Sequence, residues 1–93
     1  VPILTFKTFD EVIERANDND LGLCSYLYTN SMDKAHIGSE KLESGCVAVN
    51  TGVVAIAEAP FGGIKQTGYG REGGSGAIKD YLNVKYTHMG LKI

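Results

Sequence analysis

Short apolar runs alternate with helix-like segments along the first half of this chain, and this alternation limits the fold more than any other feature. The runs at residues 3–6, 23–28 and 46–49 are short, apolar and suited to buried strands. Strands that alternate with helices of about ten residues predict a βαβαβ unit, with parallel strands and right-handed crossovers. We therefore expect an α/β fold.

The two helices between these runs have recognisable start signals. The hydroxyl of Thr8 can cap the first helix while Glu11 completes a capping box. An apolar stripe then recurs at helical intervals, at Phe9, Val12, Ile13 and Ala16. The second helix is expected to follow a cap at Asn30 or Ser31 and to end at Gly45.

The pattern changes after Asn50, where residues 51–74 show no clear helical or strand period and carry much of the chain's glycine. We expect a long structured loop, and its place after the carboxyl end of the third strand favours a ligand site. A short helix over residues 75–81 is expected next. Alternation of apolar and polar residues over 82–87 then predicts a half-buried strand, whose uncovered edge invites pairing with another chain.

Composition excludes several classes of protein. The 93 residues suffice for one small domain or a piece of a larger one, and the core would be marginal without a partner chain or missing sequence. A formal charge of −2 gives no basic excess for nucleic acid, and no apolar run is long enough for a membrane span. We expect Val1 to be the first residue of a fragment and not a native N-terminus. Cys24 and Cys46 lack CxxC spacing, which indicates buried thiols in a reducing compartment, the cytoplasm.

Residues 68–73, GYGREG, fit the GxGxxG pattern of dinucleotide-binding loops. That pattern needs a buried strand before it and a later βαβ unit, and the sequence offers neither, so glycines required for positive φ explain it better. His36 and His88 show no metal-ligand spacing, and no base is tied by sequence to either cysteine. No catalytic, cofactor-binding or metal-binding residue is therefore expected here.

Residues 60–72, PFGGIKQTGYGRE, resemble the PFGGxKxSGxGRE signature of the aldehyde dehydrogenase superfamily, with Thr67 where serine is commoner. Other segments also look like family motifs: residues 1–3 the strand after EExFGP, 16–23 the AN...GL segment, 45–50 the GxVxVN strand, and 81–86 the YLxxKY tail of succinic-semialdehyde dehydrogenases. The resemblance implies that the chain is the C-terminal portion of such an enzyme.

On this resemblance, residues 1–50 would complete the catalytic domain, 51–81 would form the substrate-tunnel and interface loop with a short helix, and 82–93 would be an oligomerisation strand. The family oxidises aldehydes with NAD or NADP through a cysteine thiolate and a thioester. Its nucleophile, general base and cofactor contacts would all lie upstream of Val1. The chain alone would thus be inactive, bind no cofactor, and depend on the N-terminal part and on further copies as partners.

The resemblance also implies site residues. The substrate would contact Phe61, Ala55 and Ile56, and the subunit interface would include Arg71, Val84 and Tyr86. From spacing alone, a plug for the core beneath the loop is the slightly favoured role of Phe61. Succinic-semialdehyde dehydrogenases carry a serine before PFGG to help hold the far carboxylate, but residues 54–57 here read VAIA. Succinic semialdehyde is the leading substrate, and glutarate semialdehyde, ketoglutarate semialdehyde or another small aldehyde stay open.

A hypothesis from a different class is a free-standing α/β module without catalysis. It would self-associate through the terminal strand and bind a small anion in the glycine loop. The sequence does not distinguish NAD from NADP, or a dimer from a tetramer.

Overall fold

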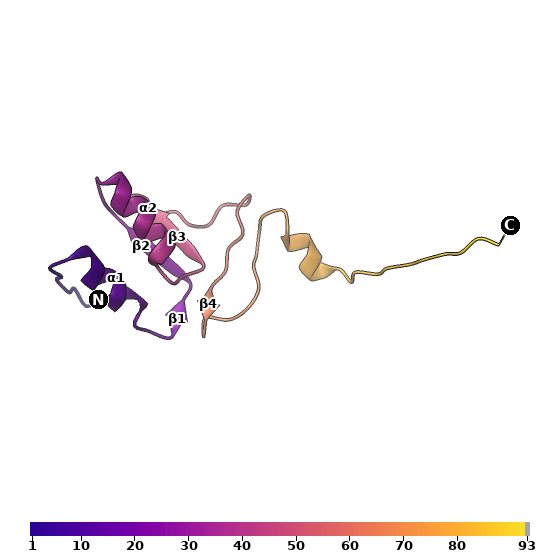
Figure 1. Cartoon of the computed structure of the whole chain (residues 1–93), viewed down its shortest axis with the longest axis horizontal. Helices are drawn as coiled ribbons and strands as arrows, with labels where there is room; N and C mark the ends of the chain where they lie inside the picture. The colour runs from indigo at the N-terminus through magenta and orange to yellow at the C-terminus, as the bar shows by residue number, and fades with distance from the viewer. Residues whose placement is uncertain (93) are drawn as a thin grey trace.

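The centre of the fold is a parallel pair of strands, β2 (Cys24–Leu27) and β3 (Cys46–Val49), joined by helix α2 (Met32–Lys41). In this computed structural model, which describes residues 1–92, α2 lies against the two strands (Figure 1). The register places Cys24 opposite Cys46 and Leu27 opposite Val49. This βαβ unit confirms the α/β class and the parallel pairing that the alternation predicts.

Helix α1 (Phe9–Asn17) precedes this unit and contacts α2. The Thr8 hydroxyl accepts a hydrogen bond from the backbone N–H of Glu11 at 3.2 Å, which confirms the predicted cap. The Glu11 carboxylate accepts from the N–H of Lys7, not from that of Thr8, so the capping box is closed one residue earlier than expected. Of the predicted apolar stripe, Ile13 is buried and Ala16 is exposed.

A second, smaller sheet pairs β1 (Leu21–Gly22) with β4 (Ile64–Lys65) in antiparallel register. The sequence predicted only loop at residues 64 and 65. A strand of two residues has no period to detect, and its pairing depends on a segment more than forty positions away. This small sheet attaches the glycine-rich segment to the βαβ unit.

Three element predictions differ from the structure. Residues 3–6, expected as the first strand, form no strand, because no described segment lies alongside to complete their hydrogen bonds. Helix α2 ends at Lys41 instead of Gly45, since the Asn17 side chain donates to the Lys41 carbonyl and accepts from the Glu43 N–H, both at 2.8 Å. The short helix predicted over 75–81 is a 3₁₀ helix, η1 (Ala77–Tyr81).

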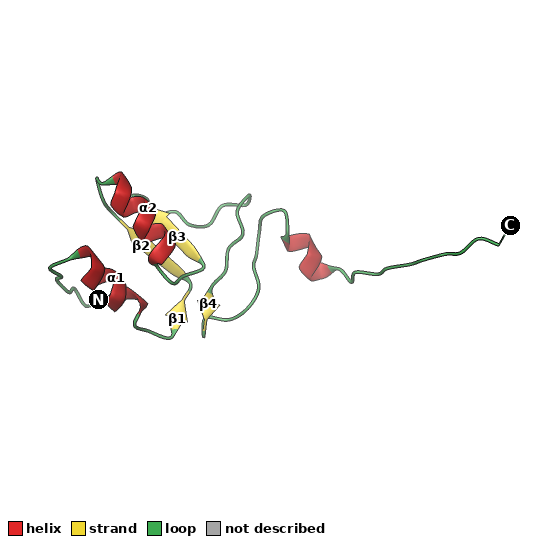
Figure 2. Cartoon of the chain, viewed as in Figure 1, coloured by secondary structure: helices red, strands yellow, loops and turns green. Residues whose placement is uncertain are grey.

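Residues 82–92 run outward as an extended tail (Figure 2). The molecule measures 75 × 26 × 21 Å and its radius of gyration is 19.2 Å, against about 12 Å for a compact chain of this length. Within residues 1–92 this tail pairs with no other segment, and Val84 and Tyr86 are 95% and 85% exposed. A strand here therefore stays a prediction, and residue 93 of the expected strand lies outside the described residues.

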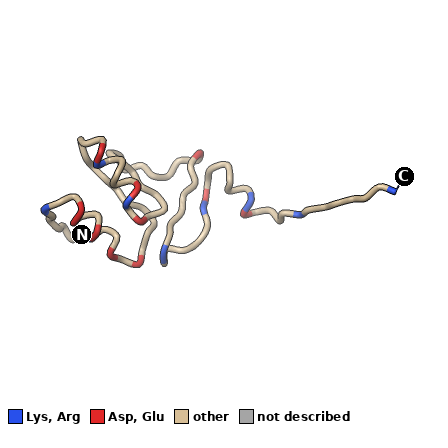
Figure 3. The backbone as a smooth tube through the Cα atoms, in the orientation of Figure 1, with Lys and Arg blue, Asp and Glu red and all other residues tan. Residues whose placement is uncertain are grey.

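The described core is small, with Ile13 and Ala48 as its buried apolar residues. Many large apolar side chains are exposed instead, among them Ile3, Leu4 and Phe6 next to α1. Acidic and basic side chains are interspersed over the elements (Figure 3). No helix in residues 1–92 combines the length and the apolar character that crossing a membrane requires.

Candidate functional site

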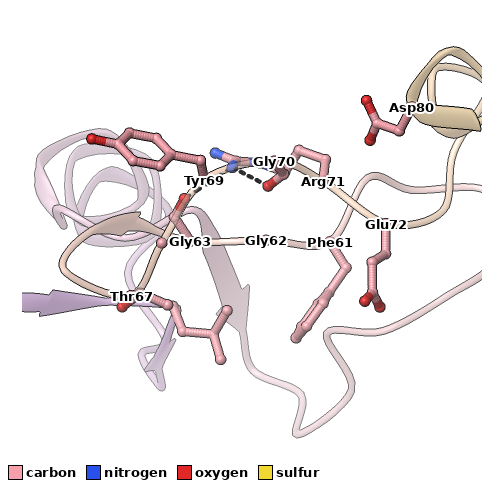
Figure 4. A pocket seen from close by; sticks show the side chains of 11 residues that line it. Phe61, Gly62, Gly63, Thr67, Tyr69, Gly70, Arg71, Glu72 and Asp80 are labelled. Atoms are coloured by element: carbon pink, nitrogen blue, oxygen red, sulfur yellow. Dashed lines mark hydrogen bonds between the residues drawn. The ribbon is translucent and has the colours of Figure 1, made fainter.

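The glycine-rich segment folds back on itself at Phe61 and Glu72. The N–H of each residue donates to the carbonyl of the other, and both N···O distances are 2.7 Å. This reciprocal pair closes the intervening residues into a loop and fixes the backbone from which the Phe61 ring projects (Figure 4). The site is therefore built on a fixed backbone turn.

The Arg71 side chain lies across this loop. Its Nη1 donates to the Gly63 carbonyl at 2.9 Å and to the Gly70 carbonyl at 2.8 Å (Figure 4). Hydrogen bonds to a charged donor are among the stronger ones in proteins. The guanidinium thus stabilises the loop from within.

Glycine is required in this loop for two separate reasons. The φ angles of Gly68 and Gly70 are 119° and 88°, a region that side chains disfavour, which agrees with the positive φ expected from the sequence. At Gly62, by contrast, a Cβ atom would collide with the Gly70 carbonyl and would lie 2.7 Å from the Cδ of Arg71. Backbone geometry and close packing together explain the glycine content.

Residues 68–73 do not adopt the geometry of a dinucleotide-binding loop. The element before them is β4, two residues long and antiparallel, and the next helix is η1, a 3₁₀ helix that begins only at Ala77. A pyrophosphate site needs a buried strand that leads directly into the N-terminus of a helix. These residues therefore do not fit the pyrophosphate of NAD or NADP.

Thr67 attaches the loop to the smaller sheet. Its hydroxyl accepts a hydrogen bond from the N–H of Gly22, a buried residue, at 2.8 Å. Serine presents the same hydroxyl, so threonine at this position preserves the contact. The departure from the commoner serine is therefore conservative in its hydrogen bonding.

Lys65 makes a second attachment, which the sequence reasoning missed. Its ammonium group donates to the carbonyls of Asn17 at 2.9 Å and Asn19 at 3.1 Å, at the end of α1. It also lies 2.6 Å from the Glu43 carboxylate. A cation at a helix C-terminus satisfies free carbonyls and interacts favourably with the helix dipole. The place of Lys65 in the PFGGxK pattern was a signal that the residue matters, but it did not indicate these contacts.

The three residues singled out for substrate contact, Ala55, Ile56 and Phe61, line one open hollow of about 350 Å³. Phe61 is partly buried, while Ala55 and Ile56 are exposed. The turn before Phe61 is held by a bond from the Ala59 N–H to the Ile56 carbonyl at 3.2 Å. The structure thus brings these side chains to one place, where they line the hollow together with Glu72.

A second hollow, of about 360 Å³, lies beside Arg71 (Figure 4). Glu72 and Asp80 both line it, although in the sequence they appear as scattered acids. The other two predicted interface residues, Val84 and Tyr86, lie along the exposed tail. The structure of the single chain does not bring them together with Arg71.

Cys24 and Cys46 are neighbours in the parallel sheet, and both are half-buried, so the prediction of buried thiols is wrong. The two-stranded sheet lacks further strands that would cover them. Burial is the main cause that raises the pKa of Cys24, and the adjacent Cys46 thiol raises it further. The Cys46 thiol donates to the Gly62 carbonyl at 3.6 Å.

Neither histidine contacts these thiols. His36 lies 3.6 Å from Glu40, and the His88 ring contacts the Tyr86 hydroxyl. No three potential metal ligands gather among residues 1–92. Within residues 1–92 the thiols therefore have no histidine beside them to act as the activating base.

Comparison with known proteins identifies one family. The model of the aldehyde dehydrogenase family matches residues 1–87. The chain is 45% identical over 89 residues to a mitochondrial succinate-semialdehyde dehydrogenase of Oryza sativa subsp. japonica, covering 96% of the chain and 17% of that enzyme. It is 47% identical to a 3-sulfolactaldehyde dehydrogenase of Pseudomonas putida, covering 96% of the chain and 18% of that enzyme.

Two further matches concern the cofactor. An NADP(+) succinate-semialdehyde dehydrogenase of Escherichia coli K12 is 44% identical, with 97% of this chain and 19% of that enzyme covered. An aldehyde dehydrogenase of Bacillus cereus, solved as an NAD+ complex, superposes with a TM-score of 0.84 at 44% identity, over 88% of this chain and 17% of that one. The chain thus spans less than a fifth of the length of these relatives.

Proposed function

The chain belongs to the aldehyde dehydrogenase family, and from this premise we propose that it is the C-terminal portion of an NAD(P)-dependent enzyme that oxidises a small semialdehyde to the acid. Succinic semialdehyde is the leading substrate. The match over nearly the whole chain and less than a fifth of each relative supports this assignment.

The names of two relatives favour a substrate aldehyde that carries an acidic group at its far end. One relative is named for succinate semialdehyde and another for 3-sulfolactaldehyde, whose far groups are a carboxylate and a sulfonate. Residues 54–57 of this chain offer no side-chain hydroxyl to such a group. We therefore propose that a cation outside these 93 residues holds the acid end.

The observation that carries the proposal is the hollow shared by Ala55, Ile56 and Phe61. The apolar side chains on one part of this hollow suit the short carbon chain between the two ends of a semialdehyde. The reciprocal hydrogen bonds between Phe61 and Glu72 would hold the ring in place during turnover, so that it excludes water and orients the chain.

The reacting groups would come from elsewhere in the enzyme. The thiols in this chain have no base beside them, and residues 68–73 do not fit a dinucleotide. A nicotinamide, when bound by those other parts, accepts the hydride in such an oxidation. The residues of this chain would position the substrate and join the subunits.

We also propose that residues 82–93 form a strand between subunits, with Arg71 near the same interface. Val84 and Tyr86 offer unpaired backbone and exposed apolar side chains, the features that strand addition uses. The two free thiols favour the cytoplasm or another reducing compartment. Residues 1–50, 51–81 and 82–93 would then serve as catalytic-domain, tunnel-loop and interface parts.

The test compares the isolated 93-residue chain with the intact natural protein that contains it. Each is supplied with succinic, glutaric or ketoglutaric semialdehyde and with NAD or NADP, and reduced cofactor is measured. We expect turnover by the intact protein and none by the isolated chain. Turnover by the isolated chain would show that it contains the nucleophile. An intact protein inactive on every aldehyde would favour the binding module.

A further inference from the structure

The parallel register sets Cys24 directly opposite Cys46. Neighbouring strands lie about 4.8 Å apart, which falls within the Cα separation of about 4.4–6.8 Å that disulfides span. Residues paired in a parallel ladder have their side chains on the same face of the sheet. The two sulfur atoms therefore belong to one face, opposite the face on which Leu27 packs against Gly38 of α2.

The Cys46 thiol lies close enough to Cys24 to affect its ionisation. Burial raises the pKa of Cys24 and the nearby Cys46 thiol adds to that effect, so the Cys24 thiolate is disfavoured. The pair therefore depends on the proximity of the two thiols and not on an activated thiolate. Both residues are free and partly accessible. Thiols that face each other across neighbouring strands can react with one another once one of them is oxidised.

We propose that Cys24 and Cys46 are a peroxide-sensitive thiol pair that closes reversibly into a disulfide across β2 and β3. Neither thiol is among the residues proposed above for substrate contact or for assembly.

The chemistry requires hydrogen peroxide or an organic peroxide as the oxidant. One thiol gives its proton to solvent and attacks a peroxide oxygen as the thiolate. The O–O bond breaks and a sulfenic acid forms, while the leaving oxygen takes a proton back from solvent and departs as water or an alcohol. The second thiol then attacks the sulfenic sulfur, the S–O bond breaks, and the hydroxyl leaves as water with the remaining proton. Together the thiols lose two electrons and two protons, which the peroxide accepts.

Closure of the disulfide would alter the loop of the candidate site. The Cys46 thiol donates to the carbonyl of Gly62, the residue after Phe61. A disulfide sulfur has no proton to donate, so oxidation removes this hydrogen bond. Only an effect on turnover rests on the proposed function, whereas disulfide formation does not.

The test exposes the intact natural protein to graded hydrogen peroxide, blocks the remaining thiols, and digests it with trypsin without reduction. We expect peptide 16–34 linked to peptide 42–65, lighter than their sum by two hydrogen atoms. A thiol reductant should restore both peptides with free cysteines. A denatured sample, treated identically, should give much less of this linked pair.

Single variants provide the matched control. In Cys24→Ser, the Cys46 thiol should accumulate as sulfenic acid or as a mixed disulfide, and Cys46→Ser should give the converse result at Cys24. The proposal is overturned if the unmodified folded protein keeps both thiols alkylatable under peroxide. Independent oxidation of both cysteines to sulfinic acid, without the linked peptide, would also overturn it.

Discussion

The ammonium group of Lys65 and the carboxylate of Glu43 approach to 2.6 Å, which links the glycine-rich loop to the segment after α2. The Lys65 side chain is 24% exposed and the Glu43 side chain 53% exposed. Lys65 also has a φ of 56°, an unfavourable value for a residue with a side chain. Its contacts with Glu43 and with the end of α1 offset that cost.

Replacing Lys65 with methionine should lower the free energy of unfolding by about 1–3 kcal/mol, because the carbonyls of Asn17 and Asn19 lose a charged donor. Glu43→Gln should cost at most about 1 kcal/mol, since an exposed ion pair contributes little. Urea unfolding of the intact protein measures both. Equal losses in the two variants would mean that the ion pair, not the carbonyl contacts, dominates.

The Thr67 hydroxyl is expected to matter more than its methyl group. Thr67→Val leaves the N–H of Gly22 without its acceptor, and Gly22 is buried, so we expect a loss of about 1–3 kcal/mol. Thr67→Ser keeps the hydroxyl and should stay within about 1 kcal/mol of the unmodified protein. The same urea titration distinguishes them, and a Thr67→Val protein as stable as Thr67→Ser would contradict this account.

Gly62, within the loop, and Gly76, at the N-terminus of η1, give a contrasting pair of alanine variants. At Gly62 a new Cβ meets the Gly70 carbonyl and the Arg71 side chain, so Gly62→Ala should shift the loop and destabilise the protein. At Gly76 the φ is −82°, and an added Cβ would have no atom within 4 Å apart from its chain neighbours. Gly76→Ala should therefore be neutral or stabilise the protein by about 0.4–1 kcal/mol. Thermal unfolding compares them, and a harmless Gly62→Ala would refute the packing argument.

The sequence predicted well those elements whose signals are local. The Thr8 cap, the Ser31 cap and the β3 strand each depend on residues within a few positions, and the structure confirms all three. The parallel pairing of β2 and β3 was also predicted correctly, because two strands joined by a single helix usually pair in parallel.

Contacts between distant segments were not predictable in the same way. The end of α2 is set by the Asn17 side chain, twenty-four positions from Lys41. The β1–β4 pair joins segments more than forty residues apart, and the adjacency of Cys24 and Cys46 needs the exact strand register. The role of Phe61, by contrast, came from resemblance to a family, because spacing alone left it as either a core plug or a tunnel residue.

Truncation of the Phe61 ring should impair catalysis more than folding. In the intact protein, Phe61→Ala is expected to lower kcat/KM for the semialdehyde about tenfold, the effect of losing roughly 1.4 kcal/mol of transition-state binding. Met32→Ala, at an exposed position on α2, is the control and should leave kcat/KM unchanged. Steady-state kinetics decide the matter. An unfolding midpoint that falls sharply while kcat/KM holds would identify Phe61 as a core plug instead.

The alternation in the tail yields a prediction about assembly. If residues 82–93 pair with another subunit, Val84→Asp and Tyr86→Asp should place charge against apolar surface and reduce the mass of the intact protein in solution. Lys85→Ser changes the intervening residue, which faces the other way in a strand, and should leave the mass unchanged. Light scattering coupled to size-exclusion chromatography measures the mass, and circular dichroism checks that each variant remains folded. An oligomer of unchanged mass in the folded Val84 and Tyr86 variants would remove the tail from the interface, because a strand buried between subunits cannot tolerate unpaired carboxylates on its apolar face.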